Sequence, residues 1–219
     1  MRVITLLLQE LLITSIRINN RLKVFSVFIF YSGVEKIELN NLSNKEIGYL
    51  IGLFYGDGYA NYNKKDRHYN VEFYLHSERD KDIEIFLISL LKKLRLIFSV
   101  FKDKRFNCNR IRVHSKELYN FINLDKFYEN DNFNLGFISG LVDSDGYVNL
   151  KKSTIQIINK NVKLLQKCRK ILKKLDIDSN LVKKFKYFDD KNQIYYLSIS
   201  IKFKRLKHIS KKAGRLYHS

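Results

Sequence analysis

The sequence predicts an α+β fold of two pseudo-symmetric αββαββα lobes, joined at a parallel pair of helices and carrying a saddle of β-sheet. The strongest observation is a repeat: residues 48–61 read GYLIGLFYGDGYAN, and residues 136–149 read GFISGLVDSDGYVN. After each copy, polar and apolar residues alternate as in strands, and an amphipathic helix follows. The 219 residues suffice for two such lobes.

Small residues recur at every fourth position of both copies. They are Gly48, Gly52 and Gly56 in the first copy, and Gly136, Gly140 and Ser144 in the second. Because four residues are close to one helical turn, they form a smooth stripe on a short, mostly apolar helix. Such stripes allow two backbones to approach closely, so we expect the two helices to pack stripe to stripe.

Parallel packing of these helices brings Asp57 and Asp145 together at one end of the pair. The following glycines, Gly58 and Gly146, are expected to end the helices as left-handed caps. Two adjacent carboxylates need a cation, and Mg²⁺, with Mn²⁺ as a substitute, prefers carboxylate oxygens and can activate water for attack at phosphorus. A single Gly-Asp-Gly is typical of a solvated turn, but the duplication favours a metal-dependent phosphodiester site.

The other elements follow in the same order in both halves. Ser43 and Glu46 form a capping box, so the first motif helix begins there. Alternation then predicts strands near 61–67, 71–76, 99–104 and 110–114, and helices at 82–94 and 116–123. In the second half we expect strands near 149–153, 155–159, 181–188 and 194–201, a helix at 162–175 and a final helix before the tail. The predicted organisation is an extension at 1–42, lobes at 43–123 and 132–219, and a polar linker at 124–131.

The extension holds two apolar pieces, 3–18 and 24–31, interrupted by basic and amide side chains. Neither piece reaches the roughly 18 to 20 apolar residues of a membrane span, and no small-residue cleavage site follows the first. We expect a helix and a strand packed outside the core.

The charge balance points to a polyanion as partner. Lys and Arg number 41 against 22 Asp and Glu, a formal net charge of +19. A membrane surface is disfavoured because the basic residues lie mostly on predicted strands rather than on a basic amphipathic helix. Cys108 and Cys168 are far apart, which indicates neither a disulfide framework nor a zinc site and fits an intracellular compartment, either cytoplasm or organelle matrix.

The segments LIGLFYGDG at 50–58 and ISGLVDSDG at 138–146 resemble the nonapeptide that names the LAGLIDADG homing endonucleases. The resemblance extends from about residue 43 to the end. It implies a single-chain, two-motif intron-homing enzyme that acts as a monomer. By the same resemblance, the enzyme makes Mg²⁺-dependent double-strand breaks across the minor groove of a long asymmetric DNA target and leaves 3′ overhangs.

The resemblance also assigns site residues. The metal-binding acids correspond to Asp57 and Asp145, with the preceding Gly56 and Ser144 in the same site; Asp143 occupies an earlier acidic position, where the first copy has Tyr55. Ser77 and Asn159 correspond to residues that order water around the metals. The basic residues expected to assist the transition state are Lys126 and either Lys211 or Lys212.

The polar sheet faces are expected to hold duplex DNA, with Lys and Arg on phosphates and Asn, Gln and Arg on base edges. The candidates in the first lobe are Asn61, Asn63, Lys65, Arg67, Tyr74, His76, Lys102, Lys104, Arg110 and Arg112. Those in the second lobe are Asn149, Lys151, Ser153, Gln156, Lys184 and Lys186. Two alternatives stay open: an RNA maturase that binds its host intron, and a catalytically inactive DNA-binding relative, although both acids are intact.

Overall fold

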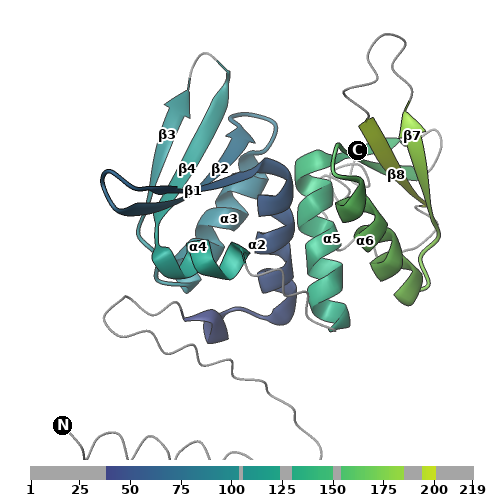
Figure 1. The fold of residues 1–219 in the computed structure, drawn as a ribbon, viewed down its shortest axis with the longest axis horizontal. Coiled ribbons are helices and arrows are strands. Elements are labelled where there is room, and N and C mark those ends of the chain that lie inside the picture. The colour runs from purple at the N-terminus through teal and green to yellow at the C-terminus, as the bar shows by residue number, and fades with distance from the viewer. Residues whose placement is uncertain (1–37, 104–105, 124–129, 150–153, 185–193, 201–219) are drawn as a thin grey trace, which may run out of the picture. The chain divides into compact units, whose positions relative to one another are not determined.

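The computed structural model describes residues 38–103, 106–123, 130–149, 154–184 and 194–200. Helices and strands follow one another in the same order in two lobes, each with a four-stranded antiparallel sheet (Figure 1). The first lobe comprises the 3-10 turn η1 (Leu39–Asn41), α2 (Asn44–Asp57), β1 (Gly58–Asn63), β2 (His68–His76), α3 (Lys81–Lys93), β3 (Phe98–Asp103), β4 (Cys108–His114) and α4 (Lys116–Asn123). The second comprises α5 (Asp131–Asp145), β5 (Gly146–Asn149), β6 (Thr154–Asn159), α6 (Val162–Lys174), β7 (Ser179–Lys184) and β8 (Ile194–Ser200). The predicted fold class is confirmed.

The two sheets share one topology. Their strand orders are β1-β2-β4-β3 and β5-β6-β8-β7, and every neighbouring pair is antiparallel. Gly58 pairs with Phe73, and Gly146 pairs with Ile157, so the glycine after each motif acid fixes the same register in both lobes. This register makes Phe73 and Ile157 structurally equivalent.

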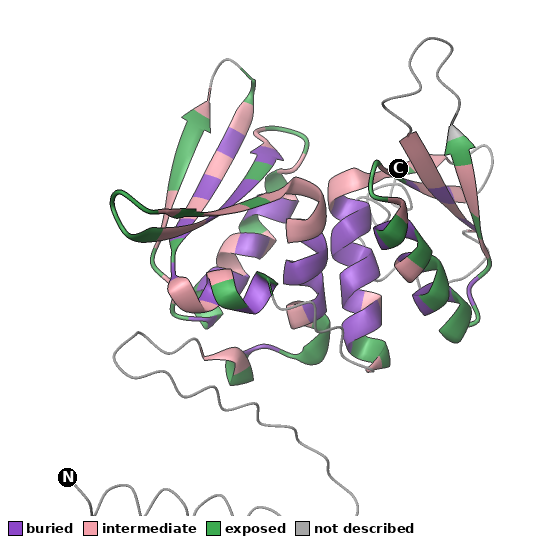
Figure 2. Ribbon diagram, in the orientation of Figure 1, coloured by how far each residue is buried: buried purple, intermediate pink, exposed green. Residues whose placement is uncertain are grey.

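One face of each sheet packs against the helices, and the other is open. Along β2, the side chains of Val71, Phe73 and Leu75 are fully buried against the helices, as their alternation predicts. Buried and exposed bands alternate along the strands in Figure 2. The helix at Lys81–Lys93 buries Ile83 and Leu87 on its inner side and leaves Phe86 half-buried.

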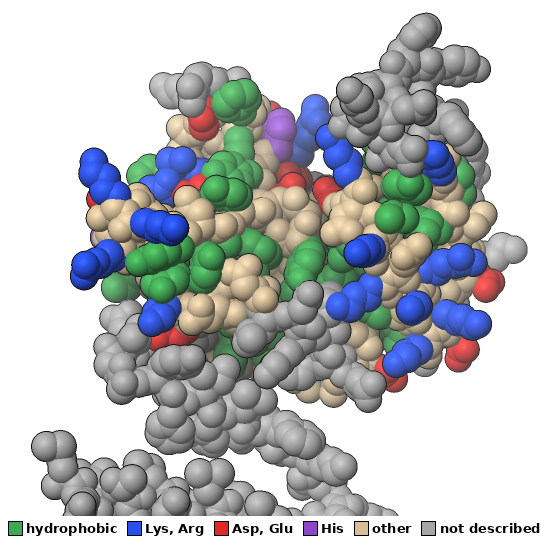
Figure 3. Space-filling model, in the orientation of Figure 1, with side chains coloured by type: hydrophobic (Ala, Val, Ile, Leu, Met, Phe, Trp, Pro, Cys, Tyr) green, Lys and Arg blue, Asp and Glu red, His purple; other side chains and the backbone are tan. Residues whose placement is uncertain are grey.

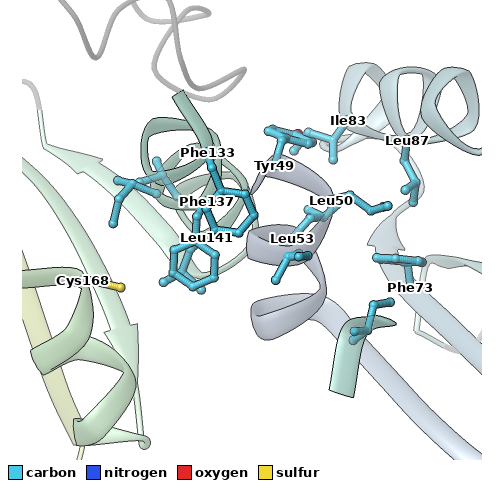
Figure 4. Packing of buried hydrophobic residues seen from close by; sticks show 14 of the residues in the cluster. Tyr49, Leu50, Leu53, Phe73, Ile83, Leu87, Phe133, Phe137, Leu141 and Cys168 are labelled. Carbon is cyan, nitrogen blue, oxygen red and sulfur yellow. The ribbon is translucent and has the colours of Figure 1, made fainter. Parts of the chain in front are cut away.

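The motif helices α2 and α5 pack directly against each other, with Tyr49, Leu53, Phe133 and Phe137 around the contact (Figure 4). A Cβ on Gly52 would lie 2.1 Å from the carbonyl oxygen of Phe137, and one on Gly140 would lie 2.1 Å from that of Tyr49. The partners advance together along both helices, because Gly48 meets Phe133 and Gly56 meets Ser144. The predicted parallel, stripe-to-stripe packing is therefore confirmed.

The predicted left-handed caps are wrong. Gly58 has φ −100° and ψ 155°, and Gly146 has φ −86° and ψ 146°, so both are extended. Each helix passes directly into a strand without an intervening turn. Glycine is required by close approach instead: a Cβ would lie 2.4 Å from the Phe54 carbonyl oxygen in the first lobe and 2.2 Å from that of Val142 in the second.

The remaining element predictions hold to within a few residues, since helix ends and strand ends are set by tertiary contacts. The first hairpin turns at residues 64–67, earlier than expected. The segment 1–37, most of the linker and the expected final helix lie outside the described residues. Among the described helices, none is long and apolar enough to cross a membrane.

Candidate functional site

The acids Asp57 and Asp145 are the last residues of α2 and α5, at the same end of the helix pair. A Cβ on Gly56 would lie 2.0 Å from the Ser144 hydroxyl oxygen and 3.3 Å from the carboxyl carbon of Asp145. The absence of a side chain at Gly56 thus allows the two helix ends to meet. The four residues that we assigned to the metal site therefore lie at one end of the helix pair.

The carboxylate of Asp145 is held by Asn159, the last residue of β6. The Asn159 amide nitrogen donates a hydrogen bond of 2.6 Å to Asp145 Oδ2. The amide oxygen accepts one of 2.7 Å from the backbone N–H of Asn161, the N-cap of α6. The chain therefore fixes which end of the amide faces the acid, and it does so through the start of the following helix.

Asp57 has different surroundings. Because Phe73 is equivalent to Ile157, the position equivalent to Asn159 is Leu75, which is fully buried, and not Ser77. The Ser77 hydroxyl instead donates to the side-chain oxygen of Asn107, next to the β3–β4 turn. The β1–β2 hairpin is longer than the β5–β6 hairpin, so matching the strands by alternation alone shifted the alignment by two residues.

A second asymmetric pair lies inside the helix interface. Asp143 is fully buried and accepts a hydrogen bond of 2.8 Å from the hydroxyl of Tyr49 on the partner helix. The pseudo-symmetric pair is Tyr55 and Phe137, whose rings meet edge to face at 5.8 Å. Asp143 therefore joins the two motif helices, and the sequence alone did not indicate this contact.

The two carboxylates match the usual protein contribution to a Mg²⁺ site, which is one or two carboxylates completed by substrate phosphates and water. Within the described segments, no group of three or more His, Cys, Asp or Glu side chains could form an all-protein cage. The Ser144 hydroxyl donates to the carbonyl oxygens of Gly140 and Leu141 at 3.1 Å, so its own helix engages it. The C-terminal ends of α2 and α5 add partial negative charge here.

The open face of the first sheet carries an ordered ionic cluster. Glu72 is only 6% exposed and accepts hydrogen bonds from Arg112 Nε, at 2.5 Å, and from the Tyr74 hydroxyl. Burial alone would raise the pKa of Glu72, but these two hydrogen bonds and the charges of Arg112 and Arg110 outweigh it and hold this pKa below its ordinary value. Glu72 was not among the predicted site residues, because an alternating strand gives no sign that an outward acid is enclosed.

Arginines and aromatic rings alternate on the same face. The guanidinium carbons of Arg110 and Arg112 lie 5.2 and 5.6 Å from the ring centre of Phe101, within cation–π range. Tyr59, Tyr74 and Phe101 are each at least 40% exposed. Figure 3 shows basic side chains interspersed with hydrophobic ones over the visible surface of both lobes.

Several predicted DNA contacts share these open faces by strand register. They are Asn61, Tyr74, His76, Arg110 and Arg112 in the first lobe, and Asn149 and Gln156 in the second. Lys65 and Arg67 lie in the β1–β2 turn. Lys102, however, alternates with Phe101 on β3 and pairs with Asn109, so its register differs from that of Arg110 and Arg112, although it lines the same hollow as Arg110.

Two of the predicted DNA-contact residues, Asn63 and His76, also form hydrogen bonds within their own turns. Asn63 Oδ1 accepts from the backbone N–H of Lys65 at 3.0 Å, and its amide donates to Asp66 at 2.7 Å, which builds the hairpin turn. His76 Nδ1 accepts from the backbone N–H groups that follow it. The predicted Lys104, Lys126, Lys151, Ser153, Lys186, Lys211 and Lys212 lie outside the described residues, as does the side chain of Lys184.

Comparison with known proteins agrees with this geometry. The LAGLIDADG-like domain family matches residues 132–211. The crystal structure of the homing endonuclease I-DmoI in complex with DNA and Ca superposes with a TM-score of 0.60 at 25% identity, covering 80% of this chain and 98% of that one. Full-length DUF199/WhiA from Thermatoga maritima, at 21% identity and a TM-score of 0.57, covers 80% of this chain and 60% of its own, and shares the fold.

The second lobe thus matches the LAGLIDADG-like domain, and the first lobe repeats its motif and its strand order. Among curated proteins it is similar to the uncharacterized protein MJ0398 of Methanocaldococcus jannaschii, with 32% identity over 142 residues. That match covers 62% of this chain and 51% of MJ0398, so the chain spans about half of the length of that relative.

Proposed function

We propose that this protein is a site-specific DNA endonuclease that cuts both strands of a long asymmetric duplex target in a Mg²⁺-dependent reaction, leaving 3′ overhangs. The observation that supports the proposal is the position of Asp57 and Asp145 as the last residues of the two packed helices, where Gly56 lies against Ser144 and Asp145. The I-DmoI structures were determined with DNA and with Ca or Mn, which supports divalent metal use in this fold. One chain provides both lobes, so we propose that it acts as a monomer. We also propose that it is intracellular.

In this proposal Asp57 and Asp145 would hold the metal ions, which supply positive charge at the scissile phosphates and an activated water. Asn159 holds the Asp145 carboxylate in one orientation through its 2.6 Å hydrogen bond. The open sheet faces bind the duplex, with Arg110 and Arg112 of the first lobe placed for phosphates or guanine edges. The ionic cluster around Glu72 fixes the Arg112 side chain before DNA arrives, which lowers the entropy lost on binding.

The test is cleavage of a randomised duplex library, with Mg²⁺ or with EDTA, by wild-type protein and by Asp57→Asn and Asp145→Asn variants. We expect discrete Mg²⁺-dependent cuts that both substitutions abolish, while duplex affinity measured in Ca²⁺ changes little. Asp66→Asn is the matched control: it removes one carboxylate in the β1–β2 turn, away from the helix ends, and should cut like wild type.

The outcomes separate the alternatives. Tight duplex binding without cuts in any divalent metal would assign the protein to the inactive DNA-binding class. Preferential binding of a folded intron RNA over duplex DNA would favour a maturase. Normal cutting by the Asp57→Asn variant would overturn the assignment of the metal site.

A further inference from the structure

A hollow of about 630 Å³ lies on the open face of the first sheet, at the end where β3 and β4 join. Its lining comprises three aromatic residues, Tyr74, Phe101 and Phe106, together with Arg110, Lys102, Asp103 and Cys108. Phe106 is 73% exposed, and Tyr74 and Phe101 are 40% and 43% exposed. Three large rings around one hollow on a polar sheet face need an explanation, because exposed apolar clusters in soluble domains mark binding sites.

The arrangement is suited to a planar ring. Aromatic side chains on an open four-stranded sheet, with arginine planes beside them, are the common means of stacking unpaired bases. The guanidinium carbon of Arg110 lies 5.2 Å from the ring centre of Phe101, so a planar cation is within cation–π distance of a ring that lines the hollow. A base inserted here would contact ring faces and the guanidinium plane together.

The hollow is lined by charges of both signs, since Arg110 and Lys102 are cationic and Asp103 is anionic. The Asp103 carboxylate can accept hydrogen bonds from base N–H groups, which a phosphate does not have, so a base matches this mixed lining better than a phosphate does. The Cys108 thiol has its pKa raised by burial first, and then by the negative charges of Asp103 and Asp57. Phosphates would therefore lie along Arg110 and Arg112, and the neutral base would enter the hollow.

The second lobe lacks this arrangement in its described part. By strand register Tyr74 corresponds to Ile158, and Arg110 to Tyr196. Among the described residues the hollow is thus particular to the first lobe, and it is not needed for pairing the two motif acids.

We propose that this hollow binds one unstacked base of single-stranded DNA, with the strand's phosphates on Arg110 and Arg112. Thymine suits it best, because its methyl group adds apolar contact with Phe101 and Phe106. This activity goes beyond cleavage of duplex DNA and requires no metal, so it is measured in EDTA, where failure of the proposed endonuclease cannot affect the result.

The probe is a labelled oligothymidylate of about ten nucleotides, within the range of ~4–16 that single-strand sites cover, compared with an abasic strand of equal length and charge. Fluorescence anisotropy with the full chain should show at least tenfold tighter binding of oligothymidylate. Phe101→Leu and Phe106→Leu should each reduce this ratio about fivefold or more. Tyr147→Leu, which removes a ring that is 56% exposed in the other lobe, should leave it unchanged.

Equal affinity for the thymidylate and abasic strands would overturn the proposal, since phosphate contacts alone would then explain binding. An equal effect of Tyr147→Leu would also overturn it, because the hollow would have no special role. Tenfold tighter binding of oligouridylate than of oligothymidylate would refute the assignment to DNA. Unchanged far-UV circular dichroism and melting temperature of the Phe106→Leu variant ensure that loss of the ratio is not loss of the fold.

Discussion

Replacing Gly52 by alanine tests the helix pair directly. The new Cβ would lie 2.1 Å from the Phe137 carbonyl oxygen, 2.9 Å from its carbonyl carbon and 3.0 Å from the Leu141 nitrogen, all of them backbone atoms. An ordinary contact begins at 3.4 Å, so α2 and α5 must separate by about 1.3 Å at this point. No flexible side chain can absorb that movement.

The sign of the change in the free energy of unfolding distinguishes a packed helix position from an exposed one. In an exposed helix, Gly→Ala stabilises by roughly 1 kcal/mol because alanine has the higher helix propensity. Here overpacking costs about 1–3 kcal/mol and the contact is with backbone, so we expect a net destabilisation of about 2 kcal/mol. For a chain of this size that lowers Tm by about 4–8 °C.

The separation should also move Asp57 relative to Asp145, because Gly56 lies one turn further along the same stripe. Misplacement of catalytic groups by about 1 Å can cost about 10²-fold in rate. We therefore expect Gly52→Ala to reduce DNA cleavage by one to two orders of magnitude at a temperature where the variant is fully folded. Differential scanning calorimetry and single-turnover cleavage provide the two measurements.

Asn44→Ala is the control, since Asn44 is exposed at the first turn of α2 and the change adds helix propensity without entering the interface. It should leave both quantities nearly unchanged. If Gly52→Ala instead raised Tm and cut DNA at the wild-type rate, the close packing of the two stripes would be refuted.

Three further predictions follow from single contacts. Asn159→Leu introduces the residue that stands at the equivalent position of the first lobe. It should slow DNA cleavage by at least tenfold and leave duplex affinity unchanged, because Asp145 loses the hydrogen-bond donor that orients it. An unchanged single-turnover rate would contradict this. Ser43→Ala removes the N-cap of α2 and should lower the free energy of unfolding by about 1 kcal/mol in urea titrations. Glu72→Gln should make the free energy of unfolding less dependent on pH in acid. Because folding lowers the pKa of Glu72, its carboxylate contributes stability that is present above the ordinary pKa of 4.5 and is lost as the pH falls through the folded-state pKa. Wild type should therefore lose more stability than the variant below pH 4.5, and Arg112→Gln should reduce the same difference.

Much of this fold could be predicted because the sequence repeats its most constrained segment. A stripe of small residues at helical spacing has one economical partner, a second such stripe, and the meeting of Gly52 with Phe137 and of Gly140 with Tyr49 follows from that spacing. The capping box at Ser43 and Glu46 needs only local contacts, and the structure shows both of its hydrogen bonds. Such features depend on residues close in the chain or on the repeat itself.

Features that depend on strand register could not be predicted. Alternation gives the side of a sheet but not the offset between two hairpins of different length. It therefore matches Asn159 with Ser77, whereas the strand register makes Asn159 equivalent to Leu75. The register of Lys102 could not be predicted for a related reason, since the start of β3 decides which residues of that strand alternate with it. Burial of Glu72 depends on Arg112 and Tyr74, which alternation does not single out as its partners.

The two lobes are alike along the helix pair and differ on their open sheet faces, and this contrast separates the roles of helices and sheets. Along the helix pair each glycine meets the opposing backbone, so a side chain on either helix would affect both lobes, and the stripes stay alike. On the open sheet faces Glu72 and Arg112 correspond to Gln156 and Ser198, which touch no part of the helix pair through that register. The central helices therefore preserve a symmetric arrangement of acids, whereas the sheets are able to present an ionic, aromatic face in one lobe and neutral polar side chains at the equivalent positions of the other. An asymmetric pair of faces on a symmetric centre suits the asymmetric DNA target that we propose.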